Sequence, residues 1–167
     1  MQEKEVRKSL RASVYDGASF AVVDGVTTSF ITPFAVALNS SVNLIAALTY
    51  VPQLAAAFVQ LFASKIVEQF RDRRKILVVT SVIQALLWIP LIIIPYASPN
   101  QKFLIVVYMT VQTLLSNLNN PIWNSLMGDI VPINERGSFF GFRNRIVGLI
   151  SFLSTIIAGV ILNYSAT

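Results

Sequence analysis

The stretch "FLIVVYMTVQTLLSNLNNPIWNSLM", Phe103 to Met127, is long enough to cross a lipid bilayer and contains no charged residue. A transmembrane α-helix needs roughly 20 mostly apolar residues. The same stretch contains three closely spaced asparagines, Asn117, Asn119 and Asn120. An amide group in hydrocarbon is costly unless it finds a partner. The stretch therefore predicts a membrane span whose asparagines have a specific role.

The whole chain has the composition of a membrane protein. Of its 167 residues, 54% are hydrophobic and only 13% are charged, and the mean hydropathy is +0.65. Soluble domains carry about 25% charged residues. The chain contains no cysteine and no histidine, so it lacks disulfides, thiolate metal ligands and the commonest general base. We therefore expect no enzymatic activity, metal, cofactor or nucleic-acid partner.

Four further segments have the length and apolar character of membrane spans. Asp24, in the first, is the only charged residue in any of them. A soluble protein built on such helices would still need polar outer faces, and these segments show none. We predict an all-α polytopic membrane helix bundle, a single membrane domain over residues 1–167. Its five spans are 18–38, 44–64, 76–96, 103–127 and 146–162.

The basic residues predict the orientation of this bundle. They gather before the first span and in the loops after the second and fourth spans, and only Lys102 lies elsewhere. Twelve of the 13 basic residues (13 less Lys102) thus share one side of a five-span chain. Because Lys and Arg collect in cytoplasmic loops, we expect a cytoplasmic N-terminus and an external C-terminus. The protein would lie in the cell membrane, plasma or inner.

Asp24 is the candidate functional carboxylate of the first span. Ionisable residues inside a membrane usually face a bundle interior or a water-filled cavity. Thr27 and Thr28, three and four residues further on, share its helical face. Asp24 could bind a proton or a cation beside a substrate path. Alternatively, it could reach water or a basic residue at the cytoplasmic end of the span.

Polar side chains of the fourth span form one broad face at helical spacing. One stripe consists of Gln112, Ser116, Asn119, Asn120 and Trp123, and a second of Thr113, Asn117, Asn120 and Asn124. Amides can hydrogen-bond between packed membrane helices, at about 0.6 kcal/mol on average. A face this wide favours a wet cavity that binds solute. The predicted substrate-binding or coupling residues are Asp24, Thr27, Thr28, Gln112, Asn117, Asn119, Asn120 and Trp123.

Three motifs resemble the major facilitator superfamily. "VEQFRDRRKILV", residues 67–78, resembles its signature between helices two and three, with an acidic position at Glu68 and a basic end. "PIWNSLMGDIVPINERGSFFGFRNRIVG", residues 121–148, is similar to the helix 4–5 connection of poorly characterised prokaryotic members. The matching positions there are Asp129, Pro132, Arg136, Gly137, Phe140, Gly141 and Arg143. "YDGASF", residues 15–20, resembles the acid-Gly opening of helix one.

The resemblance implies a fold of two six-helix halves that moves a small solute by alternating access. This chain would supply helices 1–5 of the N-terminal half, so we expect a fragment or truncated frame whose partner is the missing C-terminal half. The family fold places helices one and four beside the central cavity, within the lipid bilayer. Coupling to a proton or cation is compatible with Asp24.

The resemblance also implies that the charged loops hold one state of the transporter closed. The residues at these positions are Glu68, Arg73, Arg74, Lys75, Asp129, Arg136, Gly137, Arg143 and Arg145. The alternative is a non-transporting five-span scaffold or partner-binding subunit.

Overall fold

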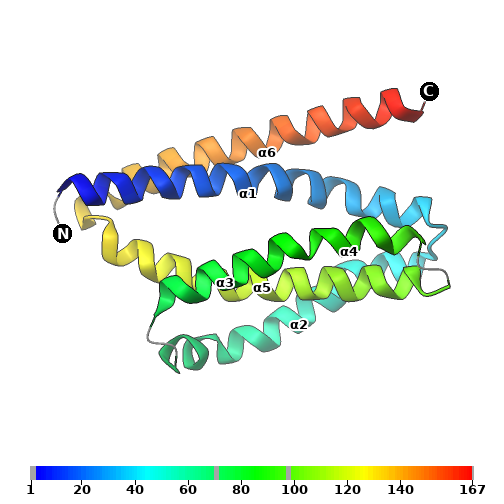
Figure 1. The fold of residues 1–167 in the computed structure, drawn as a ribbon, viewed down its shortest axis with the longest axis horizontal. Coiled ribbons are helices and arrows are strands. Elements are labelled where there is room, and N and C mark those ends of the chain that lie inside the picture. Colours follow the sequence, from blue (N-terminus) through cyan, green and yellow to red (C-terminus); the bar gives the residue numbers. More distant parts are fainter. Residues whose placement is uncertain (1–2, 70–71, 97–98, 167) are drawn as a thin grey trace. The chain divides into compact units, whose positions relative to one another are not determined.

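The computed structural model describes residues 3–69, 72–96 and 99–166, with side chains placed in residues 4–62, 72–96 and 99–164. Every element in these residues is helical, which confirms the predicted all-α fold class (Figure 1). The elements are α1 (Glu3–Ala37), α2 (Val42–Gln69), α3 (Arg73–Leu86), α4 (Trp88–Ile93), η1 (Ile94–Tyr96), α5 (Gln101–Ile130), η2 (Ile133–Glu135) and α6 (Arg136–Ala166).

Four of the described helical segments are long and apolar enough to cross a membrane. They are Lys4–Ala37, Val42–Phe62, Arg73–Tyr96 and Ile133–Tyr164. They coincide with the predicted first, second, third and fifth spans, although α1 and α6 begin well before the predicted limits. α5 has 30 residues and contains the predicted fourth span. α5 is not among the four segments, because its amide and hydroxyl side chains lower the hydropathy of its apolar stretch.

The third span is one apolar segment made of two helices. α3 ends at Leu86, and α4 begins at Trp88. Pro90 lies four residues after Leu86, so it has no N–H to donate to the Leu86 carbonyl, and its ring crowds that carbonyl. The helix is interrupted there for this reason. By contrast, α1 continues through Pro33 and α5 through Pro121.

The helices form two compact units. Unit 1 comprises residues 1–33 and 128–167, which include most of α1 and all of α6. In this unit Gly17 lies against Arg143, and Gly25 lies against Ser151. The residue numbers rise together along both helices, so α1 and α6 run parallel (Figure 1). A first and a fifth span must cross a membrane in the same direction, and the parallel packing agrees with this.

Unit 2 comprises residues 34–127, with α2, α3, α4 and most of α5. The Arg73 side chain donates to Ser125 Oγ, and Gln84 donates to Ser116 Oγ, so α3 runs antiparallel to α5. Gln60 on α2 donates a hydrogen bond to Asn117 on α5. Lys102, near the start of α5, donates to the carbonyl of Asn39, just before the start of α2. α2 and α5 are therefore parallel. Both relations are those expected of alternating spans.

The turn between α1 and α2 is fixed by backbone hydrogen bonds and by one lysine. Asn39 adopts a left-handed conformation with φ of 53°. Its N–H donates to the Val36 carbonyl, and the Ser40 N–H donates to Ala35, the pattern of a Schellman motif. The Asn39 carbonyl accepts a hydrogen bond of 2.6 Å from Lys102 Nζ. The single basic residue of the predicted outer loops therefore has a structural partner.

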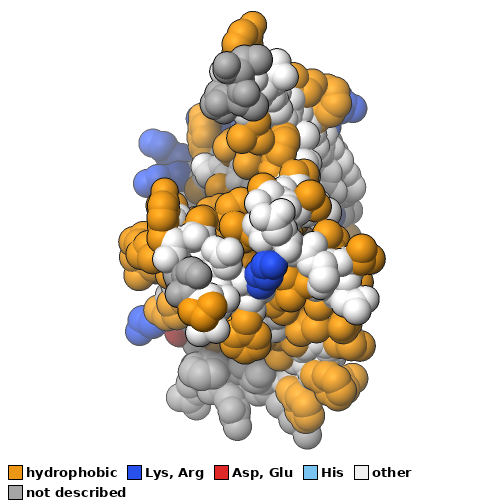
Figure 2. Space-filling view, turned by 90° about the vertical axis from the view of Figure 1, so that its right-hand side faces the viewer, with side chains coloured by type: hydrophobic (Ala, Val, Ile, Leu, Met, Phe, Trp, Pro, Cys, Tyr) orange, Lys and Arg blue, Asp and Glu red, His pale blue; other side chains and the backbone are white. Residues whose placement is uncertain are grey.

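Large hydrophobic side chains are exposed along most of the helices. Examples with more than half of their surface exposed are Phe58 and Leu61 on α2, Ile92 on α4, and Phe152 and Ile157 on α6. Hydrophobic side chains also cover much of the described part of the face shown in Figure 2, where basic side chains are few. A surface of this kind is suited to contact with lipid chains rather than water.

The orientation in the membrane stays a prediction that two single-cysteine variants can test. Ser41 and Ser138 are both exposed, and they lie on opposite sides of the predicted five-span chain. In this cysteine-free protein, Ser41→Cys should react with an impermeant maleimide in intact cells. Ser138→Cys should react only after the cells are permeabilised. The reverse pattern would place the N-terminus outside.

Candidate functional site

Asp24 lies on an exposed part of α1 in unit 1. Within the described part of the chain, no cation lies within ion-pair distance of its carboxylate. Thr28 is exposed beside it, and Thr27 is half-buried, with its hydroxyl donating to the Val23 carbonyl at 2.7 Å. The predicted three-residue face is therefore present. Of its side chains, those of Asp24 and Thr28 are the more accessible.

The helix that carries Asp24 is held by very close packing against α6. A methyl group added to Gly25 would stand 2.5 Å from the Ser151 carbonyl oxygen, closer than real side chains come to backbone. Thr155 Oγ1 lies 2.9 Å from the Gly25 carbonyl and 3.3 Å from Ser29 Oγ. This close packing fixes the backbone of α1 next to Asp24.

The sequence revealed only one side of this seam. Ser151, Thr155 and Gly159 recur every four residues on α6, which predicts a ridge of small side chains for close packing. On α1, Gly17, Ala21 and Gly25 recur at the same spacing, and all three are buried. Gly25 lies against Ser151, whereas Gly17 lies against Arg143 and Val147. That spacing is the signal that could have identified the partner of α6.

On α5, Asn119 is the centre of a hydrogen-bonded cluster with α3. Its Oδ1 accepts a hydrogen bond of 2.5 Å from the Thr80 hydroxyl, and its Nδ2 donates to Gln84 Oε1 at 3.0 Å. Gln84 Nε2 in turn donates to Ser116 Oγ at 2.8 Å, and Gln112 donates to the Gln84 backbone carbonyl at 3.2 Å. Both ends of the Gln84 amide are thus satisfied by α5.

Asn117 makes a second interhelical contact, with α2. Gln60 Nε2 donates to Asn117 Oδ1 at 2.6 Å, and Asn117 Nδ2 donates to the Thr113 carbonyl at 2.9 Å. Asn117 and Asn119 therefore form hydrogen bonds between packed helices, the use of amides that the sequence analysis weighed against a wet cavity. Their role in binding solute stays a prediction.

Asn120 differs from its two neighbours. Its side chain is exposed, and among the described residues no hydrogen bond is recorded for its amide. Trp123, three residues further on, is half-buried, and Asn124 is exposed. The polar face of α5 therefore has two parts. Some of its amides bind α2 or α3, whereas those of Asn120 and Asn124 are exposed.

The predicted site residues belong to both units. Asp24, Thr27 and Thr28 lie in unit 1, and the five predicted residues of α5 lie in unit 2. The sequence analysis missed two residues of the α5 cluster, Thr80 and Gln84. Their signal is a spacing of four, which places both side chains on one face of a span whose only other small polar residue is Ser81.

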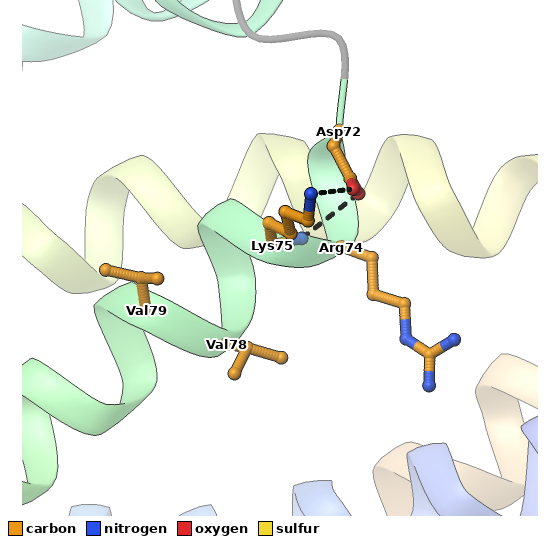
Figure 3. A pocket seen from close by; sticks show the side chains of 5 residues that line it. All are labelled: Asp72, Arg74, Lys75, Val78 and Val79. Carbon is orange, nitrogen blue, oxygen red and sulfur yellow. Dashed lines mark hydrogen bonds and ion pairs between the residues drawn. The ribbon is translucent and has the colours of Figure 1, made fainter.

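The charged residues before α3 have distinct contacts. Asp72 caps α3 by accepting a hydrogen bond of 3.2 Å from the Lys75 backbone N–H, and its carboxylate lies 3.5 Å from Lys75 Nζ (Figure 3). Arg73 Nη1 donates to Ser125 Oγ on α5 at 2.8 Å. The Glu68 side chain lies outside the described residues.

Arg136 caps the C-terminal end of α5. Its Nε donates to the Val131 carbonyl at 3.2 Å, and its Nη2 donates to the Gly128 carbonyl. The last carbonyls of a helix lack intrahelical partners, and a positive charge is favourable beside them. Arg136 therefore stabilises the short connection between α5 and α6. Gly137 lies in open space one residue later.

Arg143 links α6 to the beginning of α1. Its Nε donates to the Ser13 carbonyl at 3.3 Å, and its guanidinium covers Gly17, where a methyl group would stand 2.6 Å from Nη2. The carboxylate of Asp16 interacts with it electrostatically. Two of the sequence motifs, "YDGASF" and the aromatic-Gly-x-Arg start of α6, therefore meet in the structure. Asp129 and Arg145 are exposed.

The sequence profile of the Major Facilitator Superfamily matches residues 17–166. The chain belongs to the major facilitator superfamily. The match begins within "YDGASF" and includes both charged loops, so the resemblance drawn from these motifs is confirmed. No curated protein and no solved structure matches the chain significantly. Major facilitator superfamily members are membrane transporters rather than enzymes, and this member is a multi-pass membrane protein.

Proposed function

We propose that this major facilitator superfamily protein takes part in secondary active transport of a small solute by alternating access. It acts in the cell membrane with its N-terminus in the cytoplasm, together with a C-terminal set of helices that completes the solute cavity. The proposal is supported by the family match over residues 17–166.

The proposal that the chain has a solute or ion site rests on Asp24. A carboxylate within a membrane span costs free energy and is retained where it serves a substrate or ion pathway. Among the described residues, Asp24 has no cationic partner that would explain it as a structural ion pair, and its side chain is exposed. Asp24 therefore binds a cationic group of the solute or a coupling proton or cation, with Thr28 beside it and Thr27 supporting the helix.

The α5 residues have two roles in this proposal. Asn120 and Trp123 contact the solute, because an accessible amide beside an indole offers both a hydrogen bond and an apolar wall. Gln112, Asn117 and Asn119 hold α5 against α2 and α3 through the hydrogen bonds described above. Asn120, on the same broad polar face, stays exposed beside these bonded amides.

The charged loops hold the cytoplasmic ends of the helices in a defined state. Arg136 fixes the α5–α6 connection and Arg143 fixes α6 to α1, while Arg73 fixes α3 to α5. Glu68, Lys75, Asp129, Gly137 and Arg145 belong to the same loops. These charged residues lie outside the predicted spans, so they act on the conformational equilibrium rather than on solute binding.

A solute-binding screen with a charge variant tests this function. The purified chain is mixed with a panel of sugars, amino acids, peptides and cationic drugs, and binding is followed by thermal stability and then by uptake into proteoliposomes. Asp24→Asn should weaken binding of the identified solute about five-fold, because the neutral amide loses the charge–charge attraction.

The matched control is Glu5→Gln, which removes one negative charge from an exposed position outside the predicted spans. It should leave solute binding unchanged. Equal solute binding by wild type and Asp24→Asn would show that Asp24 is not part of the solute-binding site. A folded wild-type chain that binds no solute, either alone or together with a membrane partner that it captures, would instead support the five-span scaffold.

A further inference from the structure

The three consecutive basic residues at the start of α3 have three different environments. Arg73 donates to Ser125 on α5. Lys75 lies beside the Asp72 carboxylate at 3.5 Å. Arg74 is exposed, and within the described residues no hydrogen bond or ion pair is recorded for its guanidinium. Arg74 is therefore the one member of the triplet whose charge is not used by a neighbouring side chain that the structure describes.

Arg74 lines an open groove of about 330 Å³. The other lining residues are Asp72, Lys75, Val78 and Val79. The Arg74 side chain extends away from the Asp72–Lys75 pair and toward the side on which Val78 lies (Figure 3). Val78 and Val79 are 57% and 56% exposed. One end of the groove is therefore cationic, and the other end is apolar.

The position of the groove on α3 limits the kind of ligand that fits it. Arg73 is the first residue of the apolar segment Arg73–Tyr96. The charged end of the groove therefore lies where this segment meets the lipid headgroups. Val78 and Val79 lie about one helical turn deeper in the membrane. Asp72 already accepts from the backbone N–H of Lys75 and lies beside its ammonium group. Arg74 is thus the member of the triplet for which the described residues offer no partner. A guanidinium binds phosphate oxygens in a bidentate manner.

We propose that this groove binds the headgroup of an anionic phospholipid, with the phosphate on Arg74 and the first part of an acyl chain against Val78 and Val79. The apolar wall distinguishes a lipid from a soluble phosphate, which would leave both valines uncovered. Basic clusters at the cytoplasmic end of a membrane helix are attracted to anionic lipids. This site is independent of the solute-binding function.

Native mass spectrometry of the full chain, supplied with mixed micelles that contain phosphatidylglycerol or phosphatidylcholine, tests the proposal. Wild type should retain phosphatidylglycerol in preference to phosphatidylcholine. Arg74→Gln should weaken phosphatidylglycerol binding about five-fold, which corresponds to about 1 kcal/mol for one basic residue near an anionic surface. Arg74→Lys should retain a larger part of the affinity, because it keeps the charge and loses only the bidentate geometry.

Arg11→Gln is the matched control, since it removes the same charge from an exposed arginine on α1. Arg11→Gln should leave phosphatidylglycerol binding unchanged. An equal loss of binding in Arg11→Gln and Arg74→Gln would mean that the overall charge of the protein, and not the groove, determines lipid binding. Val78→Ser, which keeps every charge, should also weaken retention. Unchanged binding by folded Arg74→Gln would overturn the site. Displacement of the lipid by millimolar inorganic phosphate would show a soluble-anion site instead.

Discussion

Replacement of Gly25 by alanine is expected to lower the free energy of unfolding by about 1–3 kcal/mol, the usual cost of overpacking a close contact. The added methyl group would stand 2.5 Å from the Ser151 carbonyl oxygen. That oxygen belongs to the backbone of α6, so it cannot rotate away as a side chain would. The helices must separate instead, which also lengthens the hydrogen bond from Thr155 to the Gly25 carbonyl. Thermal or denaturant unfolding in detergent measures the change.

Gly148→Ala on α6 is the control for this prediction. A methyl group at Gly148 would meet no heavy atom within 4 Å. Alanine is also favoured over glycine within a helix by up to about 1 kcal/mol. Gly148→Ala should therefore leave stability unchanged or slightly raise it. If both variants lost the same stability, the cost would come from the helices themselves and the close seam would be refuted.

Replacement of Asn119 by leucine is expected to lower the free energy of unfolding by about 1–1.7 kcal/mol. Single interhelical hydrogen bonds in membrane proteins contribute about 0.6 kcal/mol on average and at most about 1.7 kcal/mol. Asn119 makes two such bonds, and its loss would leave the Thr80 hydroxyl without its α5 acceptor and Gln84 Oε1 without its α5 donor. Unfolding of the purified chain in the same detergent gives the measurement.

Asn120→Leu provides the comparison, because it makes the same chemical change one residue further along α5. Asn120 is exposed, and no side-chain hydrogen bond is recorded for it in the described part of the chain. Stability should change by less than about 0.5 kcal/mol, as for other surface substitutions. A cysteine at this position should react with small hydrophilic thiol reagents. A strongly destabilising Asn120→Leu together with an unreactive cysteine would mean that Asn120 is packed between helices.

The sequence was sufficient to predict the five long helical segments and their directions relative to one another, but not the division of the third segment into α3 and α4. Long apolar runs specify membrane helices with little ambiguity, and alternation then requires α1 to be parallel to α6 and α3 to be antiparallel to α5. Both relations are present. The family could also be predicted, because its charged motifs lie within short stretches of sequence such as 121–148.

The partners of individual polar side chains could not be predicted. The spacing of Asn119 showed which face of α5 it occupies, but not that Thr80 and Gln84 would stand opposite it. That contact depends on the rotation of α3 about its axis, which the sequence does not encode locally. The three adjacent residues Arg73, Arg74 and Lys75 are alike in sequence, and only packing assigns them different neighbours.

The parallel pairing of α1 with α6 has a consequence for biosynthesis. Gly25 and Thr155 are 130 residues apart, whereas the hydrogen bonds that join α2, α3 and α5 connect residues 28 to 57 apart. At a synthesis rate of about 5–20 residues per second, α1 waits on the order of ten seconds for its partner. The glycine ridge therefore stays open to lipid or to insertion factors until α6 has been synthesised.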